Sequence, residues 1–301
     1  EKKIFENNFF NMAPADNGLS LGAIGFYLLK FKKKNFKLNK YGLNPYLGPS
    51  FGKDEVRKII EKFNLKYQVP KNIYNDIAKN ISKGKIVGVF QGRAEFGQRS
   101  LGNRSILADP RNMTSKTRLN LLLKKRDWFM PFAPAIIDED FDKWFPNQHR
   151  NYYMQVTNQI KDKKLSKKIP SAVHVDGSSR TQLVQKEINS YFWNIINNFK
   201  KITKLPIVLN TSFNRHGITT ISNPRQAVEH LLEGCIDLLY INGFKLKIEL
   251  NKKIRNEQNL VKSEMSLLKK ENENWFKKNK LFMDKISRKK FHLFLNKKFK
   301  Q

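Results

Sequence analysis

Four short apolar runs in the middle of the chain, each next to a polar loop, place the strongest constraint on its fold. They are IVGVFQ at 86–91, PFAPAII at 131–137, PIVLNTSF at 206–213 and DLLYIN at 237–242. Runs of this length and composition predict buried strands. Further strand candidates are YYMQVT at 152–157, SAVHV at 171–175 and RTQLVQ at 180–185.

Amphipathic patterns alternate irregularly with these runs. Apolar residues at helical spacing predict helices in EVRKIIEKF after Lys53, at 74–83, at 112–126 and in RQAVEHLLEG. The last helix has an N-cap at Asn223, a first-turn proline at Pro224 and a terminating Gly234. This mixture predicts an α/β or α+β sheet domain over residues 46–249.

Both ends of the chain depart from this pattern. Residues 1–45 contain a small-residue run, 21–25, which favours a helix packed closely against a neighbour. Because such a segment is too short to fold alone, we expect it to be the end of another domain whose upstream part is missing. Residues 250–301 contain no Gly or Pro and predict a Lys-rich helical tail.

The net charge of +32 invites comparison with proteins that bind a phosphate backbone. Of the 58 basic residues, however, 45 are Lys spread along the chain, whereas six of the 13 Arg lie within 93–126. The planar arginine fork suits phosphates and carboxylates. We therefore expect the chemistry in this stretch, and the dispersed lysines do not favour a nucleic-acid partner.

The same composition argues against a membrane-spanning helix, a disulfide framework and a cysteine-based metal site within one chain. No run approaches the roughly 18 apolar residues of a membrane helix, and the first residues lack a signal-peptide pattern. The single cysteine, Cys235, lies in an apolar run and permits no intrachain disulfide. We expect a cytoplasmic protein without a membrane partner.

Two loops combine glycine or aromatic residues with clustered cations. GRAEFGQRSLGNRS presents Arg93, Arg99 and Arg104 after a predicted strand, where glycine lets the backbone approach a phosphate that arginine neutralises. A salt-bridged surface loop is an equal alternative. LLLKKRDWFMPFAP places Lys124 and Arg126 before an aromatic and proline segment, a pattern that by itself is typical of a solvated helix end.

Two further loops carry uncharged or mixed polar groups. HVDGSSR puts His174, Asp176 and Arg180 around an Asp-Gly turn, which is typical of turn chemistry, with a nucleophile–base pair or metal site as the minority alternative. NTSFNRHG follows the apolar run PIVL, and its polar side chains favour a cradle for nucleotide phosphates. These side chains are Asn210, Thr211, Ser212 and Asn214.

Five blocks occur in a fixed order between residues 92 and 244: GRAEFGQRSLGNRSILADPR, KKRDWFMPFAPAII, HVDGSSRTQ, NTSFNRHG and GCIDLLYINGF. In order and spacing they closely resemble the C-terminal half of the NodU/CmcH family of O-carbamoyltransferases. The resemblance implies a YrdC-like domain, a twisted mixed sheet with flanking helices, that activates carbamoyl phosphate with ATP, usually with Mg²⁺, to give carbamoyl-adenylate.

The resemblance also implies an N-terminal domain of the actin-like ATPase class, which passes the carbamoyl group to a hydroxyl of a sugar or natural product. PADNGLSLGAIG resembles the signature that closes that domain, so residues 1–45 are expected to be its remnant. Asp16 matches an aspartate that, in relatives, binds an iron-class metal together with upstream histidines. A lone carboxylate does not hold such a metal, and we expect no complete transfer site in this chain.

The resemblance assigns roles position by position. Arg99 resembles the family's phosphate-binding arginine, although Gln98 and Ser100 replace Pro and Ala, and Lys124 and Arg126 match the Lys and Arg before Pro-Phe-Ala-Pro. The expected catalytic residues are Arg99, Lys124, Arg126 and Arg180. The expected substrate- and nucleotide-binding residues are Arg93, Arg104, Ser105, His174, Asp176, Asn210, Thr211, Ser212 and Asn214.

Two departures from the family pattern stand out. Met130 occupies a position where relatives usually carry Arg, and residues 217–220 read Gly-Ile-Thr-Thr instead of Gly-Glu-Pro-Ile. A thioether cannot replace charged N–H donors. The alternatives to a carbamoyl-activating domain are therefore a catalytically degenerate scaffold, which would bind no nucleotide, and a YrdC-like module that binds nucleic acid through a basic concave face.

Overall fold

The computed structural model describes residues 11–33, 44–127, 130–160, 162–234 and 236–247. These residues belong to one compact unit, Glu1–Ile248. The predicted tail at 250–301 lies outside the described residues.

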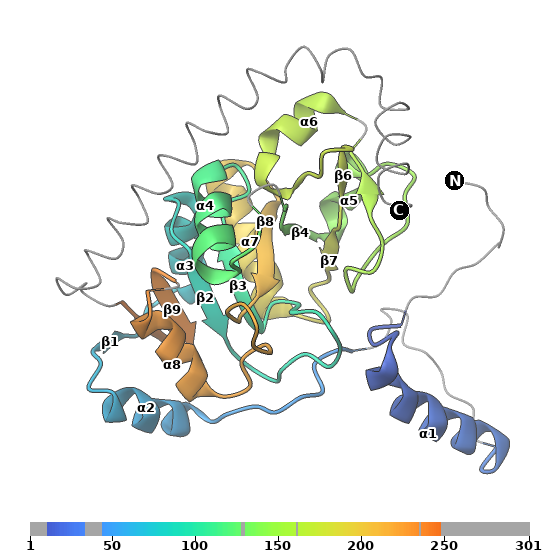
Figure 1. Ribbon diagram of the computed structural model, residues 1–301, viewed down its shortest axis with the longest axis horizontal. Coiled ribbons are helices and arrows are strands. Elements are labelled where there is room, and N and C mark those ends of the chain that lie inside the picture. Colours follow the sequence, from blue (N-terminus) through green and yellow to red (C-terminus); the bar gives the residue numbers. More distant parts are fainter. Residues whose placement is uncertain (1–10, 34–43, 128–129, 161, 235, 248–301) are drawn as a thin grey trace, which may run out of the picture. The chain divides into compact units, whose positions relative to one another are not determined.

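A mixed sheet of eight strands forms the centre of this unit (Figure 1). Its spatial order is β1 (Tyr67–Gln68), β10 (Phe244–Leu246), β9 (Leu238–Ile241), β2 (Val87–Phe90), β3 (Arg104–Ala108), β8 (Ile207–Ser212), β4 (Ala133–Ile137) and β7 (Gln182–Val184). The pairs β2–β9 and β4–β7 are parallel and the other neighbours are antiparallel. A separate antiparallel pair joins β5 (Asn158–Gln159) to β6 (Ser178–Ser179).

The four main apolar runs form β2, β4, β8 and β9, and the 180–185 candidate contains β7. The strand prediction for 152–157 is wrong. The Asn151 amide donates from Nδ2 to the carbonyl oxygen of Val156 and accepts from the backbone N–H of Gln155, which ties this segment into a compact turn. These local bonds to the Asn151 side chain take the place of a strand ladder.

The strand prediction for 171–175 is also wrong. Pro170–Ala172 is a 3₁₀ turn that begins with proline, and the next residues form a tight reversal in which the Gly177 N–H donates to the His174 carbonyl oxygen at 2.9 Å. Proline at the first helical position and the Asp-Gly turn override the apolar pattern here.

Helices flank the sheet. The predicted helices correspond to α2 (Lys53–Lys62), α3 (Ile73–Ser82), α8 (Pro224–Leu232) and α4 (Met113–Arg118), which continues into a π-helical turn at Leu119–Leu123. At α8, the Asn223 side chain and Gln226 form a reciprocal capping box. The sequence did not indicate α7 (Ser190–Thr203), and α5 (Phe141–Trp144) and α6 (Lys163–Lys168) complete this set.

Two pairs of helices pack together beside the sheet. Helix α3 packs with α7, and α2 packs with α8 (Figure 1). Side chains such as Ile60, Ile77, Phe199 and Leu209 lie fully buried in one core. The predicted mixed α/β sheet with flanking helices is thereby confirmed.

Helix α1 (Leu19–Lys30) coincides with the predicted small-residue helix. Ideal Cβ atoms at Gly22 and Gly25 would meet no atom within 4 Å, and none of the described α1 residues is buried. The close packing expected for this helix, and its origin as a domain remnant, stay predictions.

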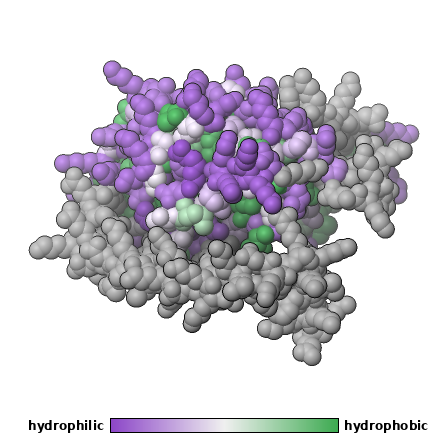
Figure 2. All heavy atoms as spheres, turned by 90° about the horizontal axis from the view of Figure 1, so that it is seen from above, coloured by the Kyte–Doolittle hydropathy of each residue, from purple (hydrophilic) through white to green (hydrophobic). Residues whose placement is uncertain are grey.

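The face of the molecule in Figure 2 is mainly hydrophilic, with apolar side chains scattered among polar ones. Within the described ranges, none of the helices combines the length and apolar character that a transmembrane span requires.

Candidate active site

Loops at the ends of four strands enclose a cavity of about 390 Å³. All four residues expected to be catalytic line it: Arg99, Lys124, Arg126 and Arg180. The whole polar cluster of the NTSFN loop lines it as well: Asn210, Thr211, Ser212 and Asn214. The sheet order thus brings together four loops that lie far apart in the sequence.

The charge of the cavity is one-sided. Arg215 adds a fifth cationic side chain to the lining, and no Asp or Glu is among the described residues that line it. Arg215 is paired at 2.9 Å with Glu233, which lies outside the lining. Such a cavity attracts anions because the field of several cations adds within low-dielectric walls.

Three guanidinium groups face one another across this cavity. Burial, together with the neighbouring charges of Arg99 and Arg126, lowers the pKa of Arg180 to about 10. Burial also lowers the pKa of Arg126. Among the described residues, neither Arg99 nor Arg180 has an ion-pair or hydrogen-bond partner for its side chain. An anion between these groups would relieve their repulsion.

Arg126 is held in place by its neighbours. Its Nε donates to Asn120 Oδ1 at 2.7 Å, and its guanidinium lies 4.5 Å from the centre of the Phe132 ring. The Nδ2 of Asn120 donates in turn to the carbonyl oxygen of Met130 at 2.9 Å. Asn120 is fully buried, so this bond network fixes Arg126 and the Met130 backbone on the same side of the cavity.

Lys124 joins two of the loops. Its ammonium donates to the Ser212 carbonyl oxygen at 2.7 Å, to Ser212 Oγ at 3.0 Å, and to the carbonyl oxygen and Oδ1 of Asn214 at 3.0 and 2.6 Å. Lys125, between the two cationic residues, has a φ of 40°, in the left-handed region. This turn lets Lys124 and Arg126 both line the cavity.

The glycine-rich loop is shaped by one carboxylate. Glu95 Oε1 accepts the backbone N–H groups of Leu101, Asn103 and Arg104 at 2.7, 2.8 and 3.2 Å. Gly102 has a φ of 121°, and a Cβ there would lie 2.4 Å from the Phe192 ring. The loop therefore has one backbone path, which carries Arg99 and Ser100 into the cavity wall.

Arg104 and its neighbours lie outside the cavity lining. The Arg104 guanidinium stacks 3.7 Å from the centre of the Phe90 ring and donates to the carbonyl oxygens of Gln91, Pro49, Gly92 and its neighbour Asn103. Burial lowers its pKa to about 10.

Ser105 and Arg93 make structural contacts too. Ser105 Oγ accepts the Gly102 N–H at 2.9 Å, and Arg93 donates to the Leu47 carbonyl oxygen at 2.6 Å. Arg93, Arg104 and Ser105, which were expected to bind substrate or nucleotide, therefore lie outside the cavity lining that contains Arg99.

His174 and Asp176 also lie outside the lining. Asp176 Oδ1 accepts the Ser178 N–H at 2.8 Å, as in an Asx turn, and His174 lies near Arg180 and Lys116. Burial is the largest cause of the lowered pKa of His174, and the two cations lower it further against the opposing Asp176. This loop borders the cavity through Arg180.

Several lining residues were not indicated by the sequence. Arg215 and His216 follow Asn214 directly, and their place in a basic loop could have signalled them. Met154 carries no such signal, because its place beside the cavity depends on the turn at 151–156. Met130 does line the cavity and is 40% exposed.

No metal site is built from the described side chains, since they include no cluster of three His, Cys, Asp or Glu. Asp16 is exposed on a 3₁₀ turn at Asp16–Gly18. A single exposed carboxylate does not fit an iron-class centre, and no chemical step is assigned to it.

The fold and the cavity define an α/β domain with a cationic cavity formed by strand-end loops, the usual place for ligands in such sheets. Residues 78–248 match the family described as Carbamoyltransferase C-terminus. The chain belongs to this carbamoyltransferase family, as its five sequence blocks predicted.

Relatives in bacteria and archaea agree with this assignment. The chain is 34% identical over 252 residues to an uncharacterized protein of Methanocaldococcus jannaschii, covering 82% of this chain and 41% of that protein. It is 34% identical over 251 residues to nodulation protein NolNO of Sinorhizobium fredii (81% and 36%) and to nodulation protein NolO of Bradyrhizobium diazoefficiens (81% and 45%). The chain thus spans less than half the length of these relatives.

Among solved structures, full-length HypF in its phosphate- and nucleotide-bound form is similar to this chain with a TM-score of 0.41 and 18% identity. The similarity covers 59% of this chain and 22% of HypF.

Proposed function

We propose that the cavity binds carbamoyl phosphate and ATP and activates the carbamoyl group as carbamoyl-adenylate. The observation that carries this proposal is the cavity lined by five cationic side chains and no described carboxylate, in a chain of the carbamoyltransferase family. Two phosphorylated substrates bring several negative charges together, and such a site offsets their repulsion.

The proposed reaction has two steps and consumes one water molecule. Carbamoyl phosphate and water give carbamate and orthophosphate, and a carbamate oxygen then attacks the α-phosphorus of ATP as pyrophosphate leaves. Arg99, Arg126 and Arg180 neutralise the acyl phosphate and the leaving pyrophosphate. Lys124, held by Ser212 and Asn214, orients the β8 loop against the nucleotide.

Mg²⁺ is the expected companion of the triphosphate. The described residues offer no carboxylate cluster for it, so the ion would be held by phosphate oxygens and water, as is common for this metal. When bound, it neutralises charge on the phosphates.

Transfer of the carbamoyl group to an acceptor hydroxyl, on a sugar or natural product, is assigned to an actin-like ATPase-class domain with its own iron-class metal. The reaction requires ATP, and we propose the cytoplasm as its compartment. Residues 1–45 would then contribute the end of that domain.

The test measures binding and turnover of this chain. Calorimetry with ATP and Mg²⁺ is expected to show binding that Arg99→Ala weakens about 10-fold or more, because a charge-assisted bond contributes roughly 1.5–3 kcal/mol. Arg93→Ala, outside the cavity, is the matched control and should stay within about twofold.

Turnover is followed as pyrophosphate release with and without carbamoyl phosphate. Release that depends on carbamoyl phosphate supports the proposal. ATP binding without such release rejects the activation step but keeps the nucleotide site, and binding of neither ligand favours the degenerate scaffold.

A further inference from the structure

Two polar atoms of the cavity wall have no hydrogen-bond partner among the described residues: Ser100 Oγ and Asn210 Oδ1. Both residues line the cavity, yet they are only 4% and 1% exposed. A buried polar atom left without a partner costs about 1–3 kcal/mol. Two such atoms in the wall of one cavity are places where a ligand can supply the missing partners.

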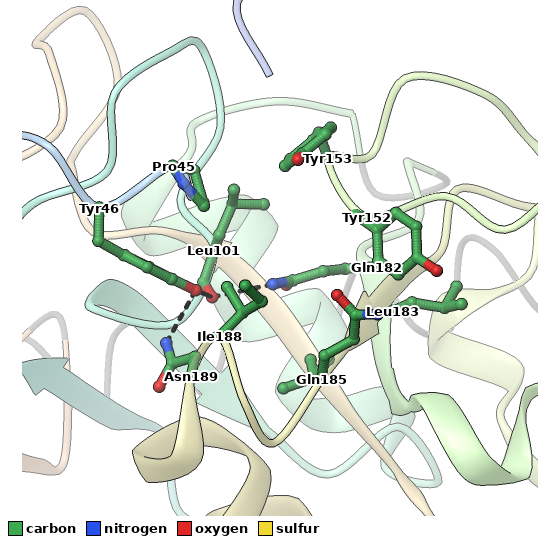
Figure 3. Close-up of a pocket in the computed structure, with 11 residues that line it drawn as sticks. Pro45, Tyr46, Leu101, Tyr152, Tyr153, Gln182, Leu183, Gln185, Ile188 and Asn189 are labelled. Atoms are coloured by element: carbon green, nitrogen blue, oxygen red, sulfur yellow. Dashed lines mark hydrogen bonds between the residues drawn. The ribbon is translucent and has the colours of Figure 1, made fainter. Parts of the chain in front are cut away.

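The orientation of the Asn210 amide is fixed by two backbone carbonyls, which can only accept. The Nε2 of Gln182 donates to the Leu101 carbonyl oxygen at 2.8 Å (Figure 3), so Gln182 Oε1 must point the other way. That oxygen accepts from Asn210 Nδ2 at 2.7 Å, and Nδ2 also donates to the Ser100 carbonyl oxygen at 3.0 Å.

Both N–H groups of the Asn210 amide are therefore used. Rotating the amide by 180° would place its oxygen against two acceptors, so the flipped form is excluded. What Asn210 has left is one acceptor, Oδ1. Gln182 is the positioning residue that holds the Asn210 amide in this orientation. Gln182 also lines a second, smaller cavity (Figure 3).

Asn210 Oδ1 is a buried acceptor in a cavity whose charged side chains are all cationic. The charged side chains around it, including Arg99, Lys124, Arg126 and Arg180, can only donate. A fully ionised phosphoryl group has only acceptors and would leave Asn210 Oδ1 unpaired. A ligand that satisfies these groups is anionic at one end and carries a hydrogen-bond donor, such as an amide N–H, at the other.

We propose that Asn210 Oδ1 accepts an amide N–H of the carbamoyl group, with Ser100 Oγ as a second contact, and that these residues select carbamoyl compounds over acyl and carboxy phosphates. The inference rests on the proposed function and adds the basis of its selectivity. A methyl group in place of the NH₂ leaves Oδ1 unpaired, and a carboxylate places oxygen against oxygen. Sites that hydrogen-bond a ligand group discriminate strongly against analogues that lack it.

The test compares three stable phosphonates that differ at one group: phosphonoacetamide, acetonylphosphonate and phosphonoacetate. Their affinities for the full chain are measured by calorimetry. Phosphonoacetamide is expected to bind about 10-fold or more tightly than the methyl ketone or the carboxylate. Asn210→Leu should reduce this preference to below about threefold, because it removes the acceptor while keeping the volume.

Each preference is the ratio of the affinities of two ligands for the same variant. A substitution that weakens both ligands equally therefore leaves the ratio unchanged. Asn194→Leu, on α7 outside the cavity lining, is the matched control and should keep the wild-type ratio. Thermal unfolding verifies that each variant is folded. Ser100→Ala removes a hydroxyl that makes no bond within the described residues, so it leaves the fold intact and should lower the preference about threefold or more.

The outcomes separate this inference from the proposed function. If the wild-type chain binds inorganic phosphate but does not distinguish the amide from the ketone, the selectivity role is wrong and the anion site stands. An unchanged preference in folded Asn210→Leu, or in Ser100→Ala should the former not fold, also overturns it. If neither phosphate nor any phosphonate binds, the proposed function fails, and the inference with it.

Discussion

Removing the charge of Arg180 should stabilise the ligand-free protein and abolish its response to phosphate. Burial, together with the charges of Arg99 and Arg126, brings the pKa of Arg180 down to about 10. A base whose pKa is lowered by folding destabilises the folded state while it is protonated in both states. This cost is present at all pH values below about 10 and disappears only as arginine deprotonates in the unfolded chain.

The size of the effect follows from that shift. One pKa unit corresponds to about 1.4 kcal/mol, which gives roughly 3 kcal/mol for a dry site. Arg180 is only partly buried, and solvent screening reduces this to about 1–2 kcal/mol. For a domain of this size, about 1 kcal/mol changes the melting temperature by roughly 2–4 °C. Arg180→Met should therefore melt about 2–8 °C above the wild-type chain, equally at pH 6 and pH 9.

The assay is calorimetric unfolding with and without phosphate, at low and high salt. Phosphate should raise the melting temperature of the wild-type chain but not of Arg180→Met, and salt should stabilise the wild-type chain more, because it screens the repulsion. Arg225→Met is the control, since among the described residues this exposed side chain pairs with Glu229 of the same helix alone, at 2.8 Å. A variant that melts below wild type, or that keeps the phosphate response, would refute the reasoning.

Three further outcomes are expected. Lys124→Met should lose about 1–3 kcal/mol of stability in chemical denaturation, because charge-assisted bonds to Ser212 and Asn214 disappear, and should weaken ATP binding in calorimetry; wild-type stability would contradict the tie between the loops. Arg104→Met should cost about 3 kcal/mol or more in urea unfolding, because four carbonyl oxygens lose their donor, while the phosphate affinity of the folded fraction stays within about twofold; a selective loss of affinity would return Arg104 to the site. Met130→Arg should raise carbamoyl-phosphate-dependent pyrophosphate release roughly 10- to 150-fold, because Met130 is exposed at the cavity and a charged contact to phosphate contributes about 1.5–3 kcal/mol; no change would show that another cation already fills this role.

The strands and helices that are marked by a continuous apolar run or by capping residues could be predicted from the sequence. The apolar runs of β2, β4, β8 and β9 and the capped helix α8 carry their own signals, because burial on both faces and N-capping depend on adjacent residues. Strand β3 could not be predicted in this way, since it begins with Arg104. A charged residue at the start of a strand favours a loop prediction, because the sequence does not show the carbonyl oxygens that surround the Arg104 guanidinium in the fold.

For the site, too, some features follow from the sequence and others only from the tertiary structure. The sequence by itself determined which residue types follow each strand, and these residue types are what predict an anionic ligand. The tertiary structure alone decided that Arg99, Arg126 and Arg180 face one cavity while Arg104 does not, and that the Asn210 amide presents its oxygen. Sheet order and the hydrogen bonds of Gln182 join residues 28 to 110 positions apart. Such long-range pairings depend on how whole elements pack, and no local pattern encodes them.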